Sequence, residues 1–152
     1  MNGRKRIYLD TSVISALFDD RNPERRNITR DFFSQIDNFE VLVSEITVKE
    51  IDDAPNPELR RRMREAIARF AVLPVNTTAE SLAREYMHHG AVPESHPADA
   101  YHIAVAVQNG TGFLLSWNFK HLVRIRTRDI VRAVNTLKRM PQITILTPGE
   151  MI

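Results

Sequence analysis

Short apolar runs alternate with longer segments of helical character along this chain. The apolar runs lie at residues 7–9, 40–44, 72–75, 112–116 and 143–146, and segments with helix-capping residues or four-residue apolar spacing separate them. Strands that alternate with helices usually pair in parallel, with the helices covering the sheet. We therefore expect an α/β fold, with a parallel sheet and helices on both of its faces.

Two of the helices are expected to begin at Asn-Pro-Glu triplets, residues 22–24 and 56–58. Asparagine caps the amino end of a helix, and proline is tolerated in the first turn because the N–H that it lacks would have no partner there. Ile28, Phe32 and Ile36 recur every four residues. This spacing predicts one buried face on the first of these helices.

The chain has 152 residues, no cysteine and a formal net charge of +2. The length, together with the absence of internal repeats, predicts a single domain over residues 1–152. Without cysteine, disulfides and thiolate metal sites are excluded, and no apolar run approaches the roughly 20 residues that a membrane span needs. We expect a cytoplasmic protein.

Basic residues gather in two sets. The first set is Arg60, Arg61, Arg62, Arg64 and Arg69, and the second is Lys120, Arg124, Arg126, Arg128 and Arg132. Each set is either a solvated surface or a contact for a polyanion such as RNA. The small net charge permits nucleic-acid binding without requiring it.

Four polar residues fall at equivalent places, where an expected strand gives way to a helix. Asp10 ends the first strand, Glu50 lies in the helix after the second, Asp99 lies in the first turn of a nearly all-apolar helix, and Asn118 follows the run at 112–116. These junctions lie along one edge of a parallel sheet, where ligand sites form. Converging carboxylates repel one another unless a cation neutralises them, and oxygen ligands favour Mg²⁺ or Mn²⁺. Such a site suits the hydrolysis of a phosphodiester.

Each of these residues also has a purely structural interpretation. Asp10 can begin a turn, and Glu50 can be an exposed helix carboxylate. Asp99 can complement the helix dipole, a contribution of under about 1 kcal/mol, and Asn118 can cap a turn. Only the four together indicate a site.

Four motifs resemble those of PIN-domain proteins, and within that family those of the toxins of VapBC-type toxin–antitoxin pairs. They are residues 8–12 (YLDTS), 43–51 (VSEITVKEI), 99–104 (DAYHIA) and 114–122 (LLSWNFKHL). One such motif is weak evidence, but all four stand here in the family's order and spacing, over most of the chain.

The resemblance implies a PIN-like three-layer sandwich and the activity of a Mg²⁺- or Mn²⁺-dependent ribonuclease. It also implies a small antitoxin partner and a homodimer. By position, Asp10, Glu50 and Asp99 match the family's three acidic residues. Thr11 or Ser12 matches the hydroxyl that steadies the site, and we expect Ser116 to support it as well.

The departure from the family is Asn118, where a fourth acid usually stands. An amide oxygen can ligate a metal or hold a metal-bound water, but it brings no negative charge. A weakened site or a one-metal site is the expected consequence. His96, His102 and His121 lie close in sequence to the expected site, and we assign them to the core or the surface rather than to catalysis.

Three functions are consistent with these residues. The first is an endoribonuclease in which Asp10, Glu50 and Asp99 bind metal and Asn118 positions water or a second ion. The second is an RNA-binding or partner-binding module that has lost its chemistry through Asn118. The third is a phosphatase with an aspartate nucleophile, which requires a second aspartate where Ser12 stands and is therefore disfavoured.

Overall fold

The computed structural model describes residues 3–152, and its centre is a five-stranded sheet in which every pair of neighbouring strands is parallel. The order across the sheet is β3–β2–β1–β4–β5. The strands are β1 (Lys5–Leu9), β2 (Phe39–Ser44), β3 (Ala71–Leu73), β4 (Phe113–Leu115) and β5 (Thr144–Leu146). The predicted parallel α/β fold is confirmed.

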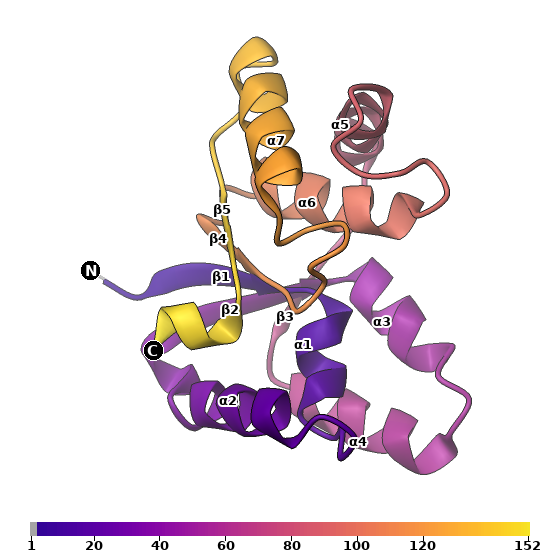
Figure 1. The fold of residues 1–152 in the computed structure, drawn as a ribbon, viewed down its shortest axis with the longest axis vertical. Helices are drawn as coiled ribbons and strands as arrows, with labels where there is room; N and C mark the ends of the chain where they lie inside the picture. The colour runs from indigo at the N-terminus through magenta and orange to yellow at the C-terminus, as the bar shows by residue number, and fades with distance from the viewer. Residues whose placement is uncertain (1–2) are drawn as a thin grey trace.

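Helices cover both faces of the sheet. Figure 1 shows α5, α6 and α7 on one side and α1, α2 and α4 on the other, while α3 lies beside the sheet edge. The α-helices are α1 (Thr11–Ala16), α2 (Pro23–Ser34), α3 (Glu45–Asp52), α4 (Pro57–Ile67), α5 (Thr77–His88), α6 (Pro97–Gln108) and α7 (Ile125–Leu137), and the 3₁₀ helices are η1 (Ile36–Asn38) and η2 (Pro148–Met151). Among residues 3–152, no helix combines the length and the apolar character needed to cross a bilayer.

The sheet separates two apolar cores. Tyr8 and Leu114 belong to the core on the side of α5, α6 and α7, and their chain neighbours Ile7, Leu9 and Leu115 belong to the core on the opposite side. Successive side chains of a strand point to opposite faces, so a strand covered on both sides is apolar throughout. The apolar runs of the sequence follow from this double burial.

Helix α6 is covered on nearly all sides, as its sequence predicts. Ala100 and all of residues 103–107 are buried, and they pack in the core that also contains residues of α5 and β4. Asp99 stands in the first turn of this helix. A helix held by contacts all round places its first-turn side chains at a fixed position.

The strand order reverses at β1. From β1 the chain proceeds to β2 and β3 on one side, and it then crosses to β4 and β5 on the other. Leu9 pairs with Leu115, and the Asp10 N–H donates to the Leu115 carbonyl at 3.2 Å. Asp10 and Ser116 therefore directly follow two adjacent strands and lie side by side. The connections diverge at such a reversal, and a crevice opens beyond the carboxyl ends of the strands.

Some element boundaries differ from the sequence expectation. Helix α2 ends at Ser34, and Ile36 begins a separate 3₁₀ helix, although its side chain is buried as predicted. Strand β3 covers residues 71–73 instead of 72–75, because Pro74 has no N–H to donate to a neighbouring strand. In α7, Val134 is buried and Leu137 is largely exposed at the end of the helix.

Candidate active site

Asp10 is a buried carboxylate held by three hydrogen bonds. It directly follows β1 and caps α1, where its Oδ1 accepts from the Ser12 backbone N–H at 3.0 Å and from the Ser12 hydroxyl at 2.5 Å. Its Oδ2 accepts from the Ser116 hydroxyl at 2.7 Å, and only 4% of the residue is exposed. Ser12 and Ser116 thus support Asp10 from two different elements of the chain.

The environment of Asp10 favours a neutral group or a nearby positive charge. Burial raises the pKa of the Asp10 carboxyl above its usual value, and the neighbouring Asp99 charge acts in the same direction. The charge of His102 and the hydroxyl groups of Ser12 and Ser116 oppose this rise. An ionised Asp10 is therefore costly unless a cation lies close to it.

Glu50 projects from α3 toward the same edge of the sheet. Ser44 caps this helix, and with Thr47 it forms a capping box. Glu50 Oε1 accepts from the Thr11 hydroxyl at 2.8 Å and from His102 Nε2 at 2.6 Å. Burial raises the pKa of the Glu50 carboxyl, but the contacts with His102 and Thr11 outweigh it, so that the pKa lies below its usual value.

His102 is the buried centre of this network. Its Nδ1 lies 2.6 Å from the Tyr8 hydroxyl, which in turn lies 2.7 Å from the Ser44 hydroxyl. Burial lowers the pKa of the His102 imidazole, but the hydrogen bond to Glu50 and the charges of Asp10, Glu50 and Asp99 raise it above its usual value. A protonated His102 donates to both Glu50 and Tyr8.

Asp99 is held by a second histidine. Its Oδ2 accepts from the Nδ1–H group of His121 at 2.9 Å, and both side chains are more than four-fifths buried. The His121 ring also lies against His96, with 4.4 Å between the ring centroids. Asp99 thus faces the loop between β4 and α7.

Asn118 links Asp99 to Ser116, and through Ser116 to Asp10. Its Oδ1 accepts from the backbone N–H groups of Lys120 and His121, at 3.1 and 3.0 Å, so its Nδ2 is the group that faces Asp99 Oδ2 at 3.4 Å. Its backbone N–H donates to the Ser116 hydroxyl, which holds Asp10. Asn118 therefore presents a donor to Asp99, and its amide oxygen is occupied by the turn.

Hydrogen bonds connect the three predicted acids indirectly. Glu50 bonds Thr11, the residue after Asp10, and Asn118 joins Asp99 to Ser116, which bonds Asp10. Only Glu50 contacts His102, while the charges of Asp10 and Asp99 help to raise the pKa of its imidazole. The oxygens of the three acids are engaged by protein donors. Within residues 3–152, no three acidic or histidine side chains stand close enough together to hold a metal ion in their present arrangement. The arrangement is a set of neighbouring carboxylates, each neutralised or satisfied by a different partner.

Sequence reasoning missed the two histidines. His102 was expected in the core, and it is buried, but it also binds Glu50; His121 binds Asp99. In the sequence, the position of His102 one helical turn after Asp99 was the feature that could have placed it beside the expected site. Neither pairing could be read from the sequence, since 52 residues separate Glu50 from His102 and 22 separate Asp99 from His121.

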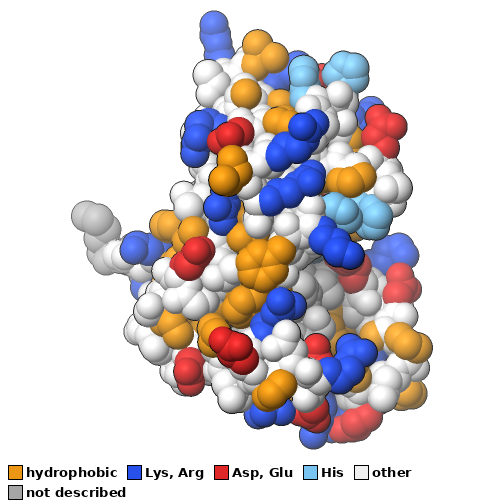
Figure 2. All heavy atoms as spheres, viewed as in Figure 1, with side chains coloured by type: hydrophobic (Ala, Val, Ile, Leu, Met, Phe, Trp, Pro, Cys, Tyr) orange, Lys and Arg blue, Asp and Glu red, His pale blue; other side chains and the backbone are white. Residues whose placement is uncertain are grey.

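The two basic sets differ in how they are neutralised. In the first set, Arg61, Arg62, Arg64 and Arg69 all form ion pairs with carboxylates of the chain. In the second set, Lys120, Arg126 and Arg128 form none with the residues that the structure describes. Figure 2 shows Lys and Arg side chains gathered over α7 and toward the middle of the molecule. Lys120 and Arg126 are exposed and are therefore the members of the second set available to an external anion, whereas Arg132 pairs with Asp129. In the first set, Arg60 makes no ion pair with the described residues and donates to the Ala54 carbonyl.

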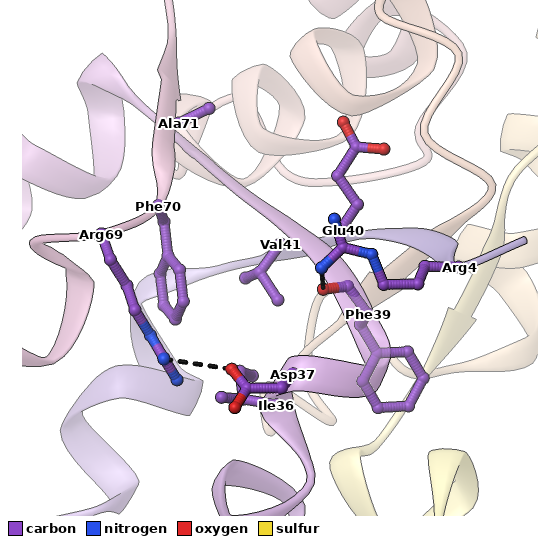
Figure 3. A pocket seen from close by; sticks show the side chains of 9 residues that line it. All are labelled: Arg4, Ile36, Asp37, Phe39, Glu40, Val41, Arg69, Phe70 and Ala71. Carbon is purple, nitrogen blue, oxygen red and sulfur yellow. Dashed lines mark hydrogen bonds and ion pairs between the residues drawn. The ribbon is translucent and has the colours of Figure 1, made fainter. Parts of the chain in front are cut away.

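The hollow shown in Figure 3 has a volume of about 260 Å³, and neither Asp10, Glu50 nor Asp99 lines it. It is lined by the amino end of β2, including Phe39 and Glu40, and by the segment before β3, where Arg69 bonds Asp37 at 3.1 Å. Ligand sites of parallel sheets form at the carboxyl ends of the strands, so this opposite edge is not the candidate site.

Comparison with known proteins supports the resemblance seen in the motifs. The PIN domain profile matches residues 7–120. At the level of sequence alone, no curated protein matches the chain.

Three solved structures share the fold. The toxin VapC20 of Mycobacterium tuberculosis, described as cleaving the sarcin–ricin loop, has a TM-score of 0.60 and 19% identity over 76% of this chain and 92% of its own. FitAB bound to a DNA fragment has a TM-score of 0.59 and 21% identity, over 94% and 95% of the two chains. VapBC2 of Rickettsia felis, bound to a fragment of its promoter, has a TM-score of 0.56 and 11% identity, over 92% and 96%. With a matching profile over three-quarters of its length and this parallel sandwich, the chain belongs to the PIN domain family.

Proposed function

We propose that this chain is an endoribonuclease that hydrolyses RNA phosphodiester bonds with Mg²⁺ or Mn²⁺. The observation that supports this most is the hydrogen-bond network that joins Asp10, Glu50 and Asp99 at the carboxyl edge of the sheet. Asp10, Glu50 and Asp99 come from three separate elements, although each also bonds protein donors. Their mutual repulsion is tolerable when a cation is close.

The donor chemistry fits a hard dication. The site offers carboxylate oxygens with hydroxyl groups around them, and the chain contains no thiol. The ion would compete with His102 and His121 for the oxygens of Glu50 and Asp99. Metal affinity is therefore expected to be modest.

The residues around the carboxylates keep them in place. Ser12 and Ser116 fix both oxygens of Asp10, and Thr11 fixes Glu50. Asn118 aligns Asp99 by donating to it from a turn that its own amide oxygen stabilises. When bound, a divalent ion orients a water molecule, lowers its pKa and stabilises the leaving oxygen.

An RNA-cleavage assay with Mn²⁺, with and without a chelator, tests this proposal. Cleavage should require the metal and should be lost in Asp10→Asn and Asp99→Ala. Asp37→Asn is the matched control, because Asp37 is an exposed carboxylate at the opposite edge of the sheet. Full activity of Asp10→Asn, or cleavage that survives the chelator, would remove the metal site from the mechanism.

We further propose that the enzyme is the toxin of a type II toxin–antitoxin pair, cytoplasmic, homodimeric and held in check by a small antitoxin. The VapC20, FitAB and VapBC2 structures share its fold, and two of them are described in complex with DNA. Co-expression with the product of the adjacent open reading frame tests the pair. Co-purification with loss of RNA cleavage is the expected result, and light scattering of the isolated chain tests the dimer.

The second candidate is an RNA-binding or partner-binding module without catalysis. Asn118 favours it, because the fourth acidic position carries no charge and its amide oxygen is occupied by the N–H groups of a turn. Calorimetric titration separates the two. No heat from Mg²⁺ or Mn²⁺, with RNA affinity that falls steeply with salt, would favour the module.

A further inference from the structure

Two aromatic rings and an arginine lie immediately beside the candidate site. Trp117 and Phe119 flank Asn118 in sequence, and their ring centroids are 6.2 Å apart. The guanidinium of Arg25, from α2, lies 5.0 Å from the Trp117 ring and 5.6 Å from the Phe119 ring. We call these three residues the aromatic shelf.

The aromatic shelf is open to solvent. Phe119 is 50% exposed, and Trp117 and Arg25 are partly exposed. With Asn22, Glu24 and Ile28, the three residues line a hollow of about 220 Å³. Phe119 differs from a singly exposed apolar residue, because it lies against a second ring and a guanidinium and borders a hollow.

The shelf is anchored to the candidate site by hydrogen bonds. The Trp117 backbone N–H donates at 2.9 Å to the Ser12 hydroxyl, which itself donates to Asp10. The Trp117 indole N–H donates at 2.9 Å to the hydroxyl of Thr29, a fully buried residue of α2. The indole is therefore fixed at a constant position relative to Asp10.

Arg25 carries the positive charge of the shelf. Within residues 3–152 its guanidinium makes no ion pair or hydrogen bond, and its contacts are the two ring faces. Glu24 lines the hollow, and the charge of Arg25 also helps to lower the pKa of the Asp19 carboxyl. A guanidinium on an aromatic face provides both a plane for stacking and a charge for a phosphate, and Lys120 follows Phe119 with no ion pair among the described residues.

We propose that the aromatic shelf stacks a base of single-stranded RNA next to the scissile phosphate, an inference that rests on the proposed ribonuclease function. Every nucleobase offers a π-face, so aromatic and arginine planes bind unpaired bases with little sequence preference. The fixed link from Trp117 to Asp10 would set the spacing between the stacked base and the carboxylates. A side chain of a protein partner is the competing occupant, and it is favoured if octauridylate binds no more tightly than the abasic octamer.

Trp117 is the only tryptophan of the chain, so its fluorescence reports on the shelf directly. The test uses Asp10→Asn in the presence of a chelator, so that RNA binds without being cut. The probes are octauridylate and an abasic octamer with the same number of phosphates. We expect octauridylate to quench the fluorescence and the abasic octamer to leave it nearly unchanged.

Phe119→Leu, made in the same background, keeps an apolar side chain but removes the ring. It should weaken octauridylate binding roughly 5- to 150-fold, which corresponds to the 1–3 kcal/mol lost with one stacked base. Phe119→Tyr should retain the affinity. Val72→Ala is the control, because Val72 is 47% exposed on β3, the edge strand at the far side of the sheet from β4.

The proposal is overturned if both octamers quench equally, or if Phe119→Leu binds octauridylate as tightly as its parent. Cleavage by the wild-type chain is measured separately. If RNA is cut and Phe119 contributes nothing to RNA binding, the ribonuclease function stands and the aromatic shelf is not a base-stacking site. Absence of cleavage, with quenching by octauridylate alone, would instead show base stacking without the proposed function.

Discussion

The Nε2 atom of His102 lies 2.6 Å from the Oε1 atom of Glu50, and this contact joins α6 to α3 inside the protein. The imidazole is 2% exposed, and its other nitrogen lies 2.6 Å from the Tyr8 hydroxyl. A buried polar group that loses its partner incurs the full cost of desolvation. His102 is therefore a structural tie as well as a neighbour of the proposed metal ligands.

His102→Ala should lower the free energy of unfolding by about 2 kcal/mol or more, since it leaves a cavity and removes a partner from both Tyr8 and Glu50. Urea denaturation in the presence of a chelator measures the change. His88→Ala is the control, because His88 is exposed on α5. Equal stability of the two variants would show that the Glu50–His102 contact contributes nothing to folding.

The stability of the metal-free protein should depend on pH through the same pair. The pKa of His102 is raised above 6.5 in the folded protein, so its stabilisation is complete below about 6.5 and is lost as the pH rises through the folded value. The pKa of Glu50 is lowered below 4.5, so its stabilisation is complete above about 4.5 and is lost as the pH falls through the folded value. The contribution of the pair is thus greatest between these two limits.

His102→Gln provides the comparison, because glutamine can bond Glu50 but cannot become charged. We expect the stability difference between wild type and His102→Gln to be larger at pH 5.5 than at pH 8.5 in urea denaturation with a chelator. A difference that is constant across this range would contradict a protonated His102 in the folded protein.

Asn118→Asp should make the protein depend more strongly on a divalent ion. The new carboxylate can still accept from the Lys120 and His121 N–H groups, but it replaces the donor that faces Asp99 at 3.4 Å. Like charges at this distance should lower the free energy of unfolding by about 1 kcal/mol or more in a chelator. Mn²⁺ should reverse this loss.

Thermal unfolding with and without Mn²⁺ measures the effect. Asn38→Asp introduces the same charge at an exposed position of η1 and should show no response to the ion beyond that of wild type. If Mn²⁺ stabilises Asn118→Asp against thermal unfolding no more than it stabilises wild type, the side chain at position 118 does not interact with the metal.

The sequence was most informative where local rules decide the structure. The apolar run before Asp10 predicted a buried strand, and the Asn-Pro-Glu triplets predicted the starts of α2 and α4. The sequence could not show that β1 stands between β2 and β4, because strand order depends on contacts between distant segments. For the same reason, the partner of Glu50 became visible only once α3 and α6 were placed together.

RNA affinity should depend on Lys120 and Arg126 of the second basic set more than on Arg61 of the first. Lys120 and Arg126 are exposed and form no ion pair within the described residues, whereas Arg61 is paired with both Glu58 and Glu65. Each phosphate contact that is lost should weaken binding and reduce the slope of log affinity against log salt by about 0.7 for a single strand. Lys120→Gln and Arg126→Gln should each show this change.

Arg61→Gln is the matched control, because it removes one positive charge from the chain just as the other two substitutions do. Its expected effect on the salt slope is small, since the Arg61 guanidinium is already occupied by two carboxylates. Fluorescence titration of a chelated Asp10→Asn background at several salt concentrations measures all three slopes. Equal reductions in the three variants would mean that RNA affinity depends only on the net charge of the protein. A reduction in Arg61→Gln alone would indicate that RNA binds along α4 and not along α7.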